Sequence, residues 1–194
     1  MTTESPQQFW NAHYGREARI WSGNPNAALV REASSLAPGR ALDLGSGEGA
    51  DAVWLAARGW TVTAVDVSDT AIARAKGHAD AAAVADRIDW QQHDLGVSFP
   101  AGEFELVSAF FLHVPALGQI VQHAAATVAP GGTLLVVGHA PGGEHHHPVG
   151  LHTPAELVAL LQLGDEWTVE TAGTAEQTPG GRLDVVVRAR RSAV

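Results

Sequence analysis

Short apolar runs alternate along the chain with longer stretches in which apolar residues recur at helical spacing. The apolar runs predict strands at 40–45, 61–67, 87–92, 104–110 and 132–139. The stretches between them predict helices at roughly 50–58, 69–84 and 116–129. Strands that alternate with helices are typical of an α/β fold with a mostly parallel sheet.

The pattern changes in the last quarter of the chain. Residues 141–150, PGGEHHHPVG, predict a loop, and the Thr-Pro-Ala-Glu sequence at 153–156 has the order of a capping box that begins a helix. Two later runs, at 167–173 and 181–190, are joined by TAEQTPG. They predict an antiparallel hairpin at the end of the sheet.

Two helices are predicted ahead of the first strand. Ser5 as a cap, with Gln8 in the capping-box position, predicts a helix at 6–14. Asn24 as a cap predicts a second helix at 25–37. The segment between these helices is aromatic and is expected to be non-helical.

The length of 194 residues suits one compact domain and is short for two ordinary ones. Neither an internal repeat nor a linker is visible. The sequence therefore predicts a single domain at 1–194, in which residues 1–38 form an N-terminal helical leader.

Charge and composition narrow the classes of partner. The chain has 12 Lys and Arg against 21 Asp and Glu, a formal net charge of -9, and Lys76 is its only lysine. A surface that neutralises phosphates is hard to build from this set, so no nucleic acid is expected. The absence of cysteine excludes disulfides, thiolate metal sites and a Cys nucleophile.

The sequence also bears on where the protein is located and whether it forms oligomers. Neither a targeting segment nor an apolar run near the roughly 20 residues that span a bilayer is visible. We therefore expect a cytoplasmic protein without a membrane partner. Because no long heptad or wide apolar stripe is apparent, a monomer is the default expectation.

Three closely spaced glycines follow the first strand in RALDLGSGEGADAVW. Gly45, Gly47 and Gly49 stand where a strand-to-helix turn needs positive φ or where a ligand approaches the main chain. Asp66 ends the second strand, where a carboxylate can accept hydrogen bonds from both hydroxyls of a ribose. This arrangement indicates an adenosine-type ligand. The spacing also fits the relaxed dinucleotide fingerprint, so a nicotinamide cofactor stays open here.

Two further acids and the one tyrosine help to distinguish these ligands. Asp43 precedes the glycines, where it would repel a pyrophosphate but attract a cationic amino-acid tail. Asp94, in the sequence HDL, ends the third strand and is placed to accept from an adenine amino group. Tyr14 is not followed by the lysine that many short-chain dehydrogenases use. Together these residues favour a cofactor that carries adenosine and a zwitterionic amino acid.

These motifs resemble those of class I S-adenosylmethionine-dependent methyltransferases over nearly the whole chain. The similar stretches are ALDLGSGEGADAVWLAARG, VDVS, HDL, FELVSAFFLHVP and LAPGGTLLVVGHA. The resemblance implies S-adenosyl-L-methionine as cofactor. It also implies a Rossmann-like seven-stranded sheet, mostly parallel with an antiparallel C-terminal hairpin and with helices on both faces.

The leader resembles one branch of that family. FWNAHYGREARIWSGNPN, together with WLAARGWTVTAVDVS, is similar to the small tellurite-resistance and thiopurine methyltransferases. In that branch the leader folds over the cofactor, and members act on soft nucleophiles. The resemblance implies a small-molecule methyl acceptor with sulfur, selenium or tellurium as the nucleophile. Ala50 and the EHHH loop depart from the family's pattern.

The predicted site residues follow from these motifs. The cofactor-binding set is Trp21, Asp43, Gly45, Gly47, Asp66, Val67, Asp94, Leu95, Ala109 and Phe110. Within it Val67 is expected on the adenine face, and Ala109 and Phe110 near the sulfonium. Phe111 cannot share the orientation of Phe110, because successive strand residues face opposite sides.

Tyr14 and His113 are the predicted substrate contacts. Tyr14 and Trp21 suit a sulfonium cation, because aromatic faces attract cations. The alternative for this pair is that it only holds the leader onto the domain. His113 could instead cap a helix.

Histidines gather near the end of the fifth predicted strand. They are His139, His145, His146, His147 and His152. Imidazole is a common metal ligand. However, adjacent histidines on a loop rarely converge on one ion, so we predict a solvated polar loop and no metal site.

Methyl transfer from a sulfonium is an in-line displacement with a leaving group that is already activated. Positioning alone can supply about 7 to 11 kcal/mol. An anionic chalcogen arrives deprotonated, so the sequence predicts no dedicated base and no catalytic residue. Two other functions stay open: a nicotinamide-dependent oxidoreductase and a non-catalytic S-adenosylmethionine-binding protein.

Overall fold

The computed structural model describes residues 4–141, 151–176 and 183–193. The chain divides into two compact units, Met1–Asn26 with Pro38–Ala101 and Ala27–Ala37 with Gly102–Val194. Each unit is described in turn. The single domain expected from the sequence stays a prediction.

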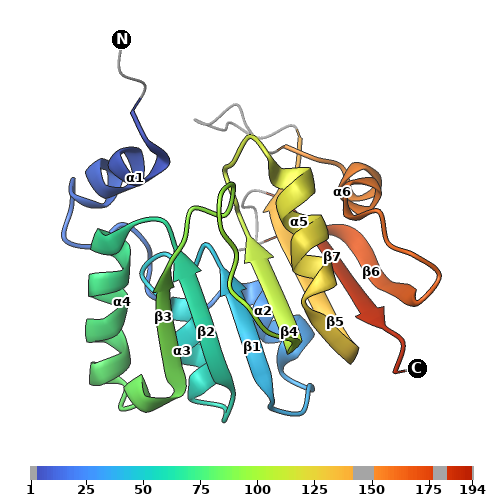
Figure 1. Ribbon diagram of the computed structural model, residues 1–194, viewed down its shortest axis with the longest axis horizontal. Coiled ribbons are helices and arrows are strands. Elements are labelled where there is room, and N and C mark those ends of the chain that lie inside the picture. The colour runs from blue at the N-terminus through green and yellow to red at the C-terminus, as the bar shows by residue number, and fades with distance from the viewer. Residues whose placement is uncertain (1–3, 142–150, 177–182, 194) are drawn as a thin grey trace. The chain divides into compact units, whose positions relative to one another are not determined.

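The first unit is built on parallel strands in the order β3-β2-β1 (Figure 1). Its elements are α1 (Pro6–Tyr14), β1 (Arg40–Leu44), α3 (Ala50–Ala56), β2 (Thr61–Asp66), α4 (Asp69–Ala81), the short 3-10 helix η1 (Ala85–Arg87) and β3 (Ile88–Gln92). Helix α3 packs on all three strands, and α4 packs on β2 and β3. Leu42, Leu44, Val62 and Val65 are fully buried, as expected for parallel strands covered by helices.

Local chemistry explains where the helices of this unit begin. Ser5 and Gln8 form the predicted capping box at the start of α1. Ser68 accepts a hydrogen bond from Ala71 N and caps α4, as predicted. Ser68 lies two residues after β2 ends at Asp66, and α4 begins at Asp69, so the chain turns sharply at that carboxylate.

The second unit has the strand order β4-β5-β7-β6. Its elements are α2 (Ala27–Ala33), β4 (Phe104–Phe110), α5 (Leu117–Ala126), β5 (Val128–His139), α6 (Pro154–Leu161), β6 (Trp167–Glu176) and β7 (Leu183–Arg191). Strands β4 and β5 are parallel, whereas β7 runs antiparallel to both β5 and β6. Helix α5 packs on β4 and β5, and α6 packs on α5, β6 and β7. The Thr153 capping box of α6 forms as predicted.

The predicted fold class is confirmed: the seven strands form a mostly parallel sheet with an antiparallel C-terminal pair, and helices pack around it. Several boundaries were wrong. The second helix begins at Ala27 and ends at Ala33, so Asn24 does not cap it. The backbone N–H of Asn26 donates instead to Asp51 Oδ1, which places residue 26 outside the helix.

The predicted end of the helix at 116–129 was also wrong. Helix α5 ends at Ala126, and β5 already begins at Val128, where the sequence predicts helix. Thr127 terminates the helix, and its carbonyl accepts from Phe104 N at the start of β4. The segments 142–150 and 177–182, which include the EHHH loop, lie outside the described residues.

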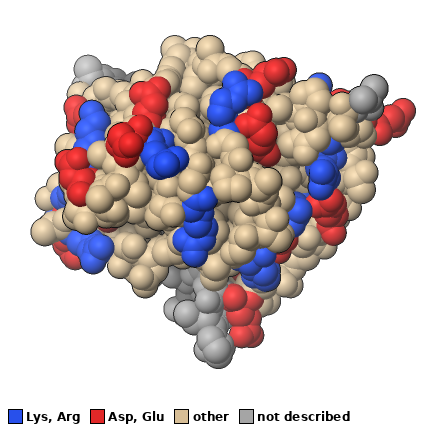
Figure 2. All heavy atoms as spheres, turned by 90° about the horizontal axis from the view of Figure 1, so that it is seen from below, with Lys and Arg blue, Asp and Glu red and all other residues tan. Residues whose placement is uncertain are grey.

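Charged side chains are mixed over the face drawn in Figure 2. Lys and Arg lie among Asp and Glu on that face, and neither sign forms a continuous area on it. Among the described residues, none of the helices has the length and apolar character needed to cross a bilayer.

Candidate active site

The loop between β1 and α3 carries the predicted glycines. Gly45 and Gly47 both have positive φ, 71° and 54°. The backbone N–H groups of Gly45 and Ser46 donate to the carbonyl of Val65, which ties the loop to β2. A Cβ on Gly47 would lie 2.9 Å from Tyr14 Oη, so glycine is required there on both grounds.

Gly49 has a different role from the other two. Its φ is 83°, and a Cβ there would lie 2.6 Å from the ring of Trp90 and 2.8 Å from Ala75 Cβ. The residue therefore allows the start of α3 to pack tightly against α4 and β3. The sequence predicted the positive φ of Gly49 correctly. The atoms that leave no room for a side chain there belong to Trp90 and Ala75, and not to a ligand.

Asp66 joins the end of β2 to the glycine loop. Its Oδ2 accepts from Gly47 N at 2.8 Å, and its Oδ1 accepts from Ser68 N at 2.9 Å. Burial raises the pKa of Asp66 and outweighs the opposite effect of backbone hydrogen bonds. Backbone N–H groups of Gly47, Ser68 and Val67 use three of the roughly four acceptor sites of the carboxylate, so Asp66 can accept one more hydrogen bond from a ligand.

Two further polar residues lie close to this loop in the sequence. Asp43, within β1, is 3% exposed. Ser46 Oγ is buried and makes no hydrogen bond to any described residue. A buried hydroxyl without a partner is uncommon in folded proteins, so Ser46 is a candidate contact for a polar ligand at the loop.

The turn after β3 contains Asp94 and Leu95, both of which are partly buried. Asp94 Oδ1 accepts from Gly96 N at 3.0 Å, and its carbonyl accepts from Val97 N and Ser98 N. These contacts form an Asx-turn. The alternative to a role of Asp94 in adenine binding is therefore that its side chain only stabilises this turn. Val67, the residue after β2, is also only partly buried.

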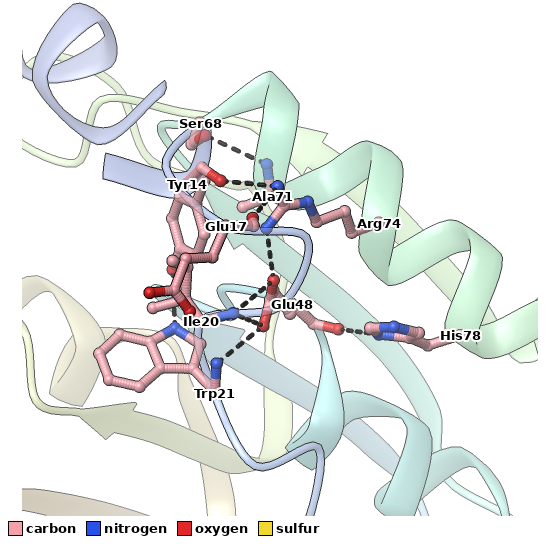
Figure 3. Close-up of polar contacts among 9 residues, drawn as sticks. All are labelled: Tyr14, Glu17, Ile20, Trp21, Glu48, Ser68, Ala71, Arg74 and His78. Atoms are coloured by element: carbon pink, nitrogen blue, oxygen red, sulfur yellow. Dashed lines mark hydrogen bonds and ion pairs between the residues drawn. The ribbon is translucent and has the colours of Figure 1, made fainter. Parts of the chain in front are cut away.

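The leader is tied to the glycine loop through Glu48 (Figure 3). The Glu48 carboxylate accepts from the backbone N–H groups of Ile20 and Trp21, and it pairs with Arg74 Nη1 at 2.7 Å. Burial raises the pKa of Glu48, but these hydrogen bonds together lower it below its ordinary value. Glu48 is thus held as a carboxylate.

Arg74 completes this connection from α4. Its Nη2 donates to the carbonyls of Tyr14 and Glu17, at 2.6 and 2.7 Å. Sequence reasoning missed both Glu48 and Arg74. The available signal was an acidic residue, Glu48, between two glycines of the loop.

Tyr14 and Trp21 lie close to Gly47 of the glycine loop, and their roles toward cofactor and substrate stay predictions (Figure 3). Trp21 Nε1 donates to Tyr14 Oη at 3.2 Å. Burial raises the pKa of Tyr14, so its phenol stays protonated. Tyr14 is 4% exposed and Trp21 is 51% exposed, so the tyrosine is packed while the indole remains open to solvent.

A second feature is a small, largely apolar pocket within the second unit. Its lining residues are Ala109, Phe111, Leu112, His113, Leu117, Val136, Val137, Gly138, His139, His152 and Leu157. Two predicted site residues, Ala109 and His113, are among them. Phe110 is buried and is not in the lining. Phe111 lines the pocket instead, because its φ of 50° ends β4 and redirects the chain.

The pocket brings three histidines to one place. His139 Nδ1 lies 3.2 Å from Asp184 Oδ1, and the rings of His113 and His139 are stacked with centroids 5.8 Å apart. Across the described ranges, no three His, Asp or Glu side chains are grouped as a metal site would require. His145, His146 and His147 lie outside those ranges. His113 does not cap α5, whose N-cap is Ala116.

Comparison with known proteins identifies the core of the chain. Residues 41–132 match a family model described as a methyltransferase domain. The match runs from β1 through the glycine loop, Asp66 and Asp94 to the start of β5. This region is a methyltransferase domain.

Relatives of the methyltransferase domain include a ubiquinone biosynthesis O-methyltransferase of Coxiella burnetii. It is 30% identical over 133 residues, which cover 66% of this chain and 56% of that protein. The chain thus spans little more than half the length of this relative.

Solved structures resemble the chain in fold. The N-methyltransferase NodS from Bradyrhizobium japonicum, in complex with S-adenosyl-L-homocysteine, matches with a TM-score of 0.75 at 19% identity, over 96% of this chain and 99% of that one. TehB from Haemophilus influenzae matches with a TM-score of 0.69 at 16% identity, over 96% and 66%.

The prediction of a methyltransferase domain that uses S-adenosylmethionine is confirmed for residues 41–132. The activity of the whole protein is a proposal, because the chain spans little more than half the length of the Coxiella burnetii relative. The tellurite and thiopurine branch is a finer prediction. The likeness to TehB concerns the fold of the methyltransferase domain alone, so the branch and its soft nucleophile stay predictions.

Proposed function

We propose that this protein transfers the methyl group of S-adenosylmethionine to a hydroxyl oxygen of a small, largely apolar molecule. The observation that carries the proposal is the pocket of the second unit. Its walls are mostly aliphatic and aromatic, and its few polar side chains are histidines. Pockets of this composition suit an apolar ligand that presents a small number of polar groups.

The residues at the glycine loop fit the proposed cofactor. Asp66 can accept a hydrogen bond from a ribose hydroxyl, and Ser46 Oγ makes no hydrogen bond to the described residues. Asp43 would meet the ammonium group, and Asp94 with Val67 and Leu95 the adenine. The open indole face of Trp21 suits the sulfonium. When bound, the cofactor supplies a methyl group on positively charged sulfur.

An oxygen acceptor is favoured by the curated relative. The Coxiella protein is named an O-methyltransferase. A histidine-containing pocket agrees with this assignment, because a hydroxyl must lose a proton when it is methylated and imidazole accepts protons near neutral pH.

A sulfur, selenium or tellurium acceptor is the second candidate. The observation that favours it is the leader, in which Tyr14 and Trp21 lie on the glycine loop as the resemblance to that branch implies. A soft anion would need no proton acceptor. It would therefore leave the histidines of the pocket without a role in the reaction.

Transfer of labelled methyl to a panel of acceptors tests the proposal. Catechol, thiophenol, selenite and tellurite would each be incubated with the protein and labelled S-adenosylmethionine. We expect labelled product from catechol. Product from thiophenol, selenite or tellurite alone would favour the second candidate, and product from none would favour a binding protein without transferase activity.

Titration with cofactors addresses the remaining alternative. We expect calorimetry to detect binding of S-adenosylhomocysteine and no binding of NADH. The opposite result would support a nicotinamide-dependent oxidoreductase. We further propose that the protein acts as a monomer of one domain, and light scattering after gel filtration would reveal a larger assembly.

A further inference from the structure

The hydroxyl of Ser46 is a buried polar group on the glycine loop. Its Oγ makes no hydrogen bond to any described residue. The main-chain groups of Ser46 are both occupied, because its N–H donates to the carbonyl of Val65 and its carbonyl accepts from Gly49 N. A buried hydroxyl without a partner costs stability. Ser46 as a whole is partly exposed, so the loop can be reached from solvent at this residue. A ligand explains the hydroxyl better than the fold does.

The phenol of Tyr14 supplies a second hydroxyl, beside the next residue of the loop. A Cβ on Gly47 would lie 2.9 Å from Tyr14 Oη, so the phenol oxygen lies close to the backbone of Gly47. Trp21 Nε1 donates to this oxygen at 3.2 Å, which leaves the phenol proton for another acceptor. Because burial raises the pKa of Tyr14, the group keeps that proton at neutral pH. Tyr14 is therefore a neutral hydrogen-bond donor at the loop.

Most main-chain donors of the glycine loop are already used. The loop residues whose N–H groups donate to protein acceptors are Gly45, Ser46, Gly47 and Gly49. Among the described residues, the N–H of Glu48 has no acceptor, so it is the one main-chain donor of residues 45–49 that is left for a ligand. A single N–H group does not satisfy a carboxylate, which has roughly four acceptor sites. An anionic group bound at this loop needs side-chain donors as well.

The positive side chains of the first unit do not supply those donors. Arg74 is occupied, because it pairs with Glu48 and donates to two carbonyls of the leader. The arginines of the leader itself, Arg16 and Arg19, are exposed, and so is Lys76 on α4. The hydroxyls at the loop are thus better placed to meet an anion than these cations are.

The amino-acid tail of S-adenosylmethionine carries one group of each charge. Its ammonium group donates hydrogen bonds, and its carboxylate accepts them. Asp43 and Asp66 suit the ammonium group and the ribose, but they repel a carboxylate. The hydroxyls of Ser46 and Tyr14 offer what the carboxylate lacks, namely donors without a negative charge.

We propose that the hydroxyls of Ser46 and Tyr14 donate hydrogen bonds to the carboxylate of the cofactor's amino-acid tail. They would thereby distinguish S-adenosylmethionine from adenosine compounds that lack this carboxylate. The inference rests on the proposed function in one respect, which is that S-adenosylmethionine binds at the glycine loop. It gives Tyr14 a contact with the cofactor, whereas the sequence predicted a contact with the methyl acceptor.

The experiment compares S-adenosylmethionine with its decarboxylated analogue, which keeps the sulfonium and ammonium groups. Calorimetry measures Kd of both compounds for the parent, Ser46→Ala, Tyr14→Phe and the control Ser35→Ala, at an exposed serine. We expect S46A and Y14F each to raise the Kd of S-adenosylmethionine by about 10- to 150-fold, the value of a hydrogen bond to a charged group. The Kd of the analogue should change by about twofold or less. S35A should match the parent with both compounds.

Unfolding of the ligand-free protein in urea separates ligand binding from a structural role. S46A removes a buried hydroxyl that has no partner, so its urea midpoint should equal or exceed that of the parent. A serine that supports the loop would lower the midpoint instead. In Y14F the indole N–H of Trp21 loses its acceptor, but Trp21 is 51% exposed and water can replace the phenol.

Other outcomes would overturn the inference. If S46A and Y14F weaken both compounds equally, the hydroxyls act on the adenosine part or on the loop itself. If neither variant weakens S-adenosylmethionine, they do not contact it. If binding of the carboxylate falls steeply with added salt, an arginine or lysine holds it. In all three cases the parent still binds S-adenosylmethionine, so the proposed function stands. A parent protein that binds neither compound would overturn the proposed function and this inference together.

Discussion

Glu48 and Arg74 form an ion pair of 2.7 Å that connects three separate parts of the first unit. Glu48 belongs to the glycine loop, Arg74 belongs to α4, and both bind main-chain groups of the leader. The Glu48 side chain is 4% exposed and that of Arg74 is 22% exposed. The pair therefore couples the position of Tyr14 and Trp21 to the loop on which they lie (Figure 3).

Replacement of Arg74 by methionine should release the leader. Glu48 would keep its two backbone donors but lose its cation. We expect the free energy of unfolding in urea to fall by about 3 kcal/mol, the low end for a broken buried pair. Trypsin should also cut faster after Arg16 and Arg19 in the leader, because Arg74 no longer holds the carbonyls of Tyr14 and Glu17.

The matched control is Arg87→Met, at an exposed arginine of the same unit. Its effect should stay within about 0.5 kcal/mol. An R74M protein whose leader resists trypsin as the parent does would show that other contacts are sufficient to hold it.

Asp66→Asn should weaken binding of S-adenosylhomocysteine. An amide would present N–H donors where Gly47 N and Ser68 N now donate, and it lacks the charge that strengthens hydrogen bonds from ribose hydroxyls. Loss of hydrogen bonds to a charged group costs about 1.5 to 3 kcal/mol, so we expect Kd to rise by about 10- to 150-fold in calorimetry. Asp69→Asn, three residues later and exposed, is the control. An unchanged Kd in D66N would remove Asp66 from the cofactor site.

Local sequence chemistry was sufficient to predict much of this fold. The caps at Ser5, Ser68 and Thr153 form as predicted because each depends on residues within three positions. Asn24 has the right chemistry for a cap but does not act as one. The N–H group of Asn26 finds its acceptor in Asp51, 25 residues away, and a contact of that kind overrides a local preference.

In the candidate site, too, features that depend on neighbouring residues were predicted, and contacts between distant positions were missed. The glycines and Asp66 were predicted because strand ends and turn geometry leave a pattern in one stretch of sequence. Glu48 and Arg74 were missed because their contact joins positions 26 residues apart on different elements. The pairing of His139 with Asp184 spans 45 residues and depends on strand register, which a single sequence does not show.

Asp51 should make stability depend on pH. Burial raises its pKa to about 6 in the folded protein, although Asn26 N donates to its Oδ1 at 2.6 Å. The folded state therefore holds this proton more tightly than the unfolded state, and stability falls as pH rises from about 4 to about 6. At 1.36 kcal/mol for each pKa unit, the loss approaches about 3 kcal/mol.

Asp51→Asn removes this titration and can keep the hydrogen bond from Asn26. We expect D51N to be more stable than the parent in urea at pH 7, and the difference to vanish near pH 4. Asp86→Asn, at an exposed position, should show no such dependence on pH. A difference between D51N and the parent that is the same at both pH values would contradict the raised pKa.

Replacement of Gly49 and of Gly77 by alanine should change the free energy of unfolding in opposite directions. A Cβ at Gly49 would lie 2.6 Å from Trp90 and 2.8 Å from Ala75, on a backbone with φ of 83°. Gly77 lies inside α4, and a Cβ there would meet nothing within 4 Å. We expect G77A to stabilise the protein by about 0.5 to 1 kcal/mol, because alanine favours helices. G49A should destabilise it by about 1 to 3 kcal/mol through strain and overpacking. Urea unfolding of both variants tests this contrast, and a G49A protein as stable as the parent would mean that α3 can move away from α4 at little cost.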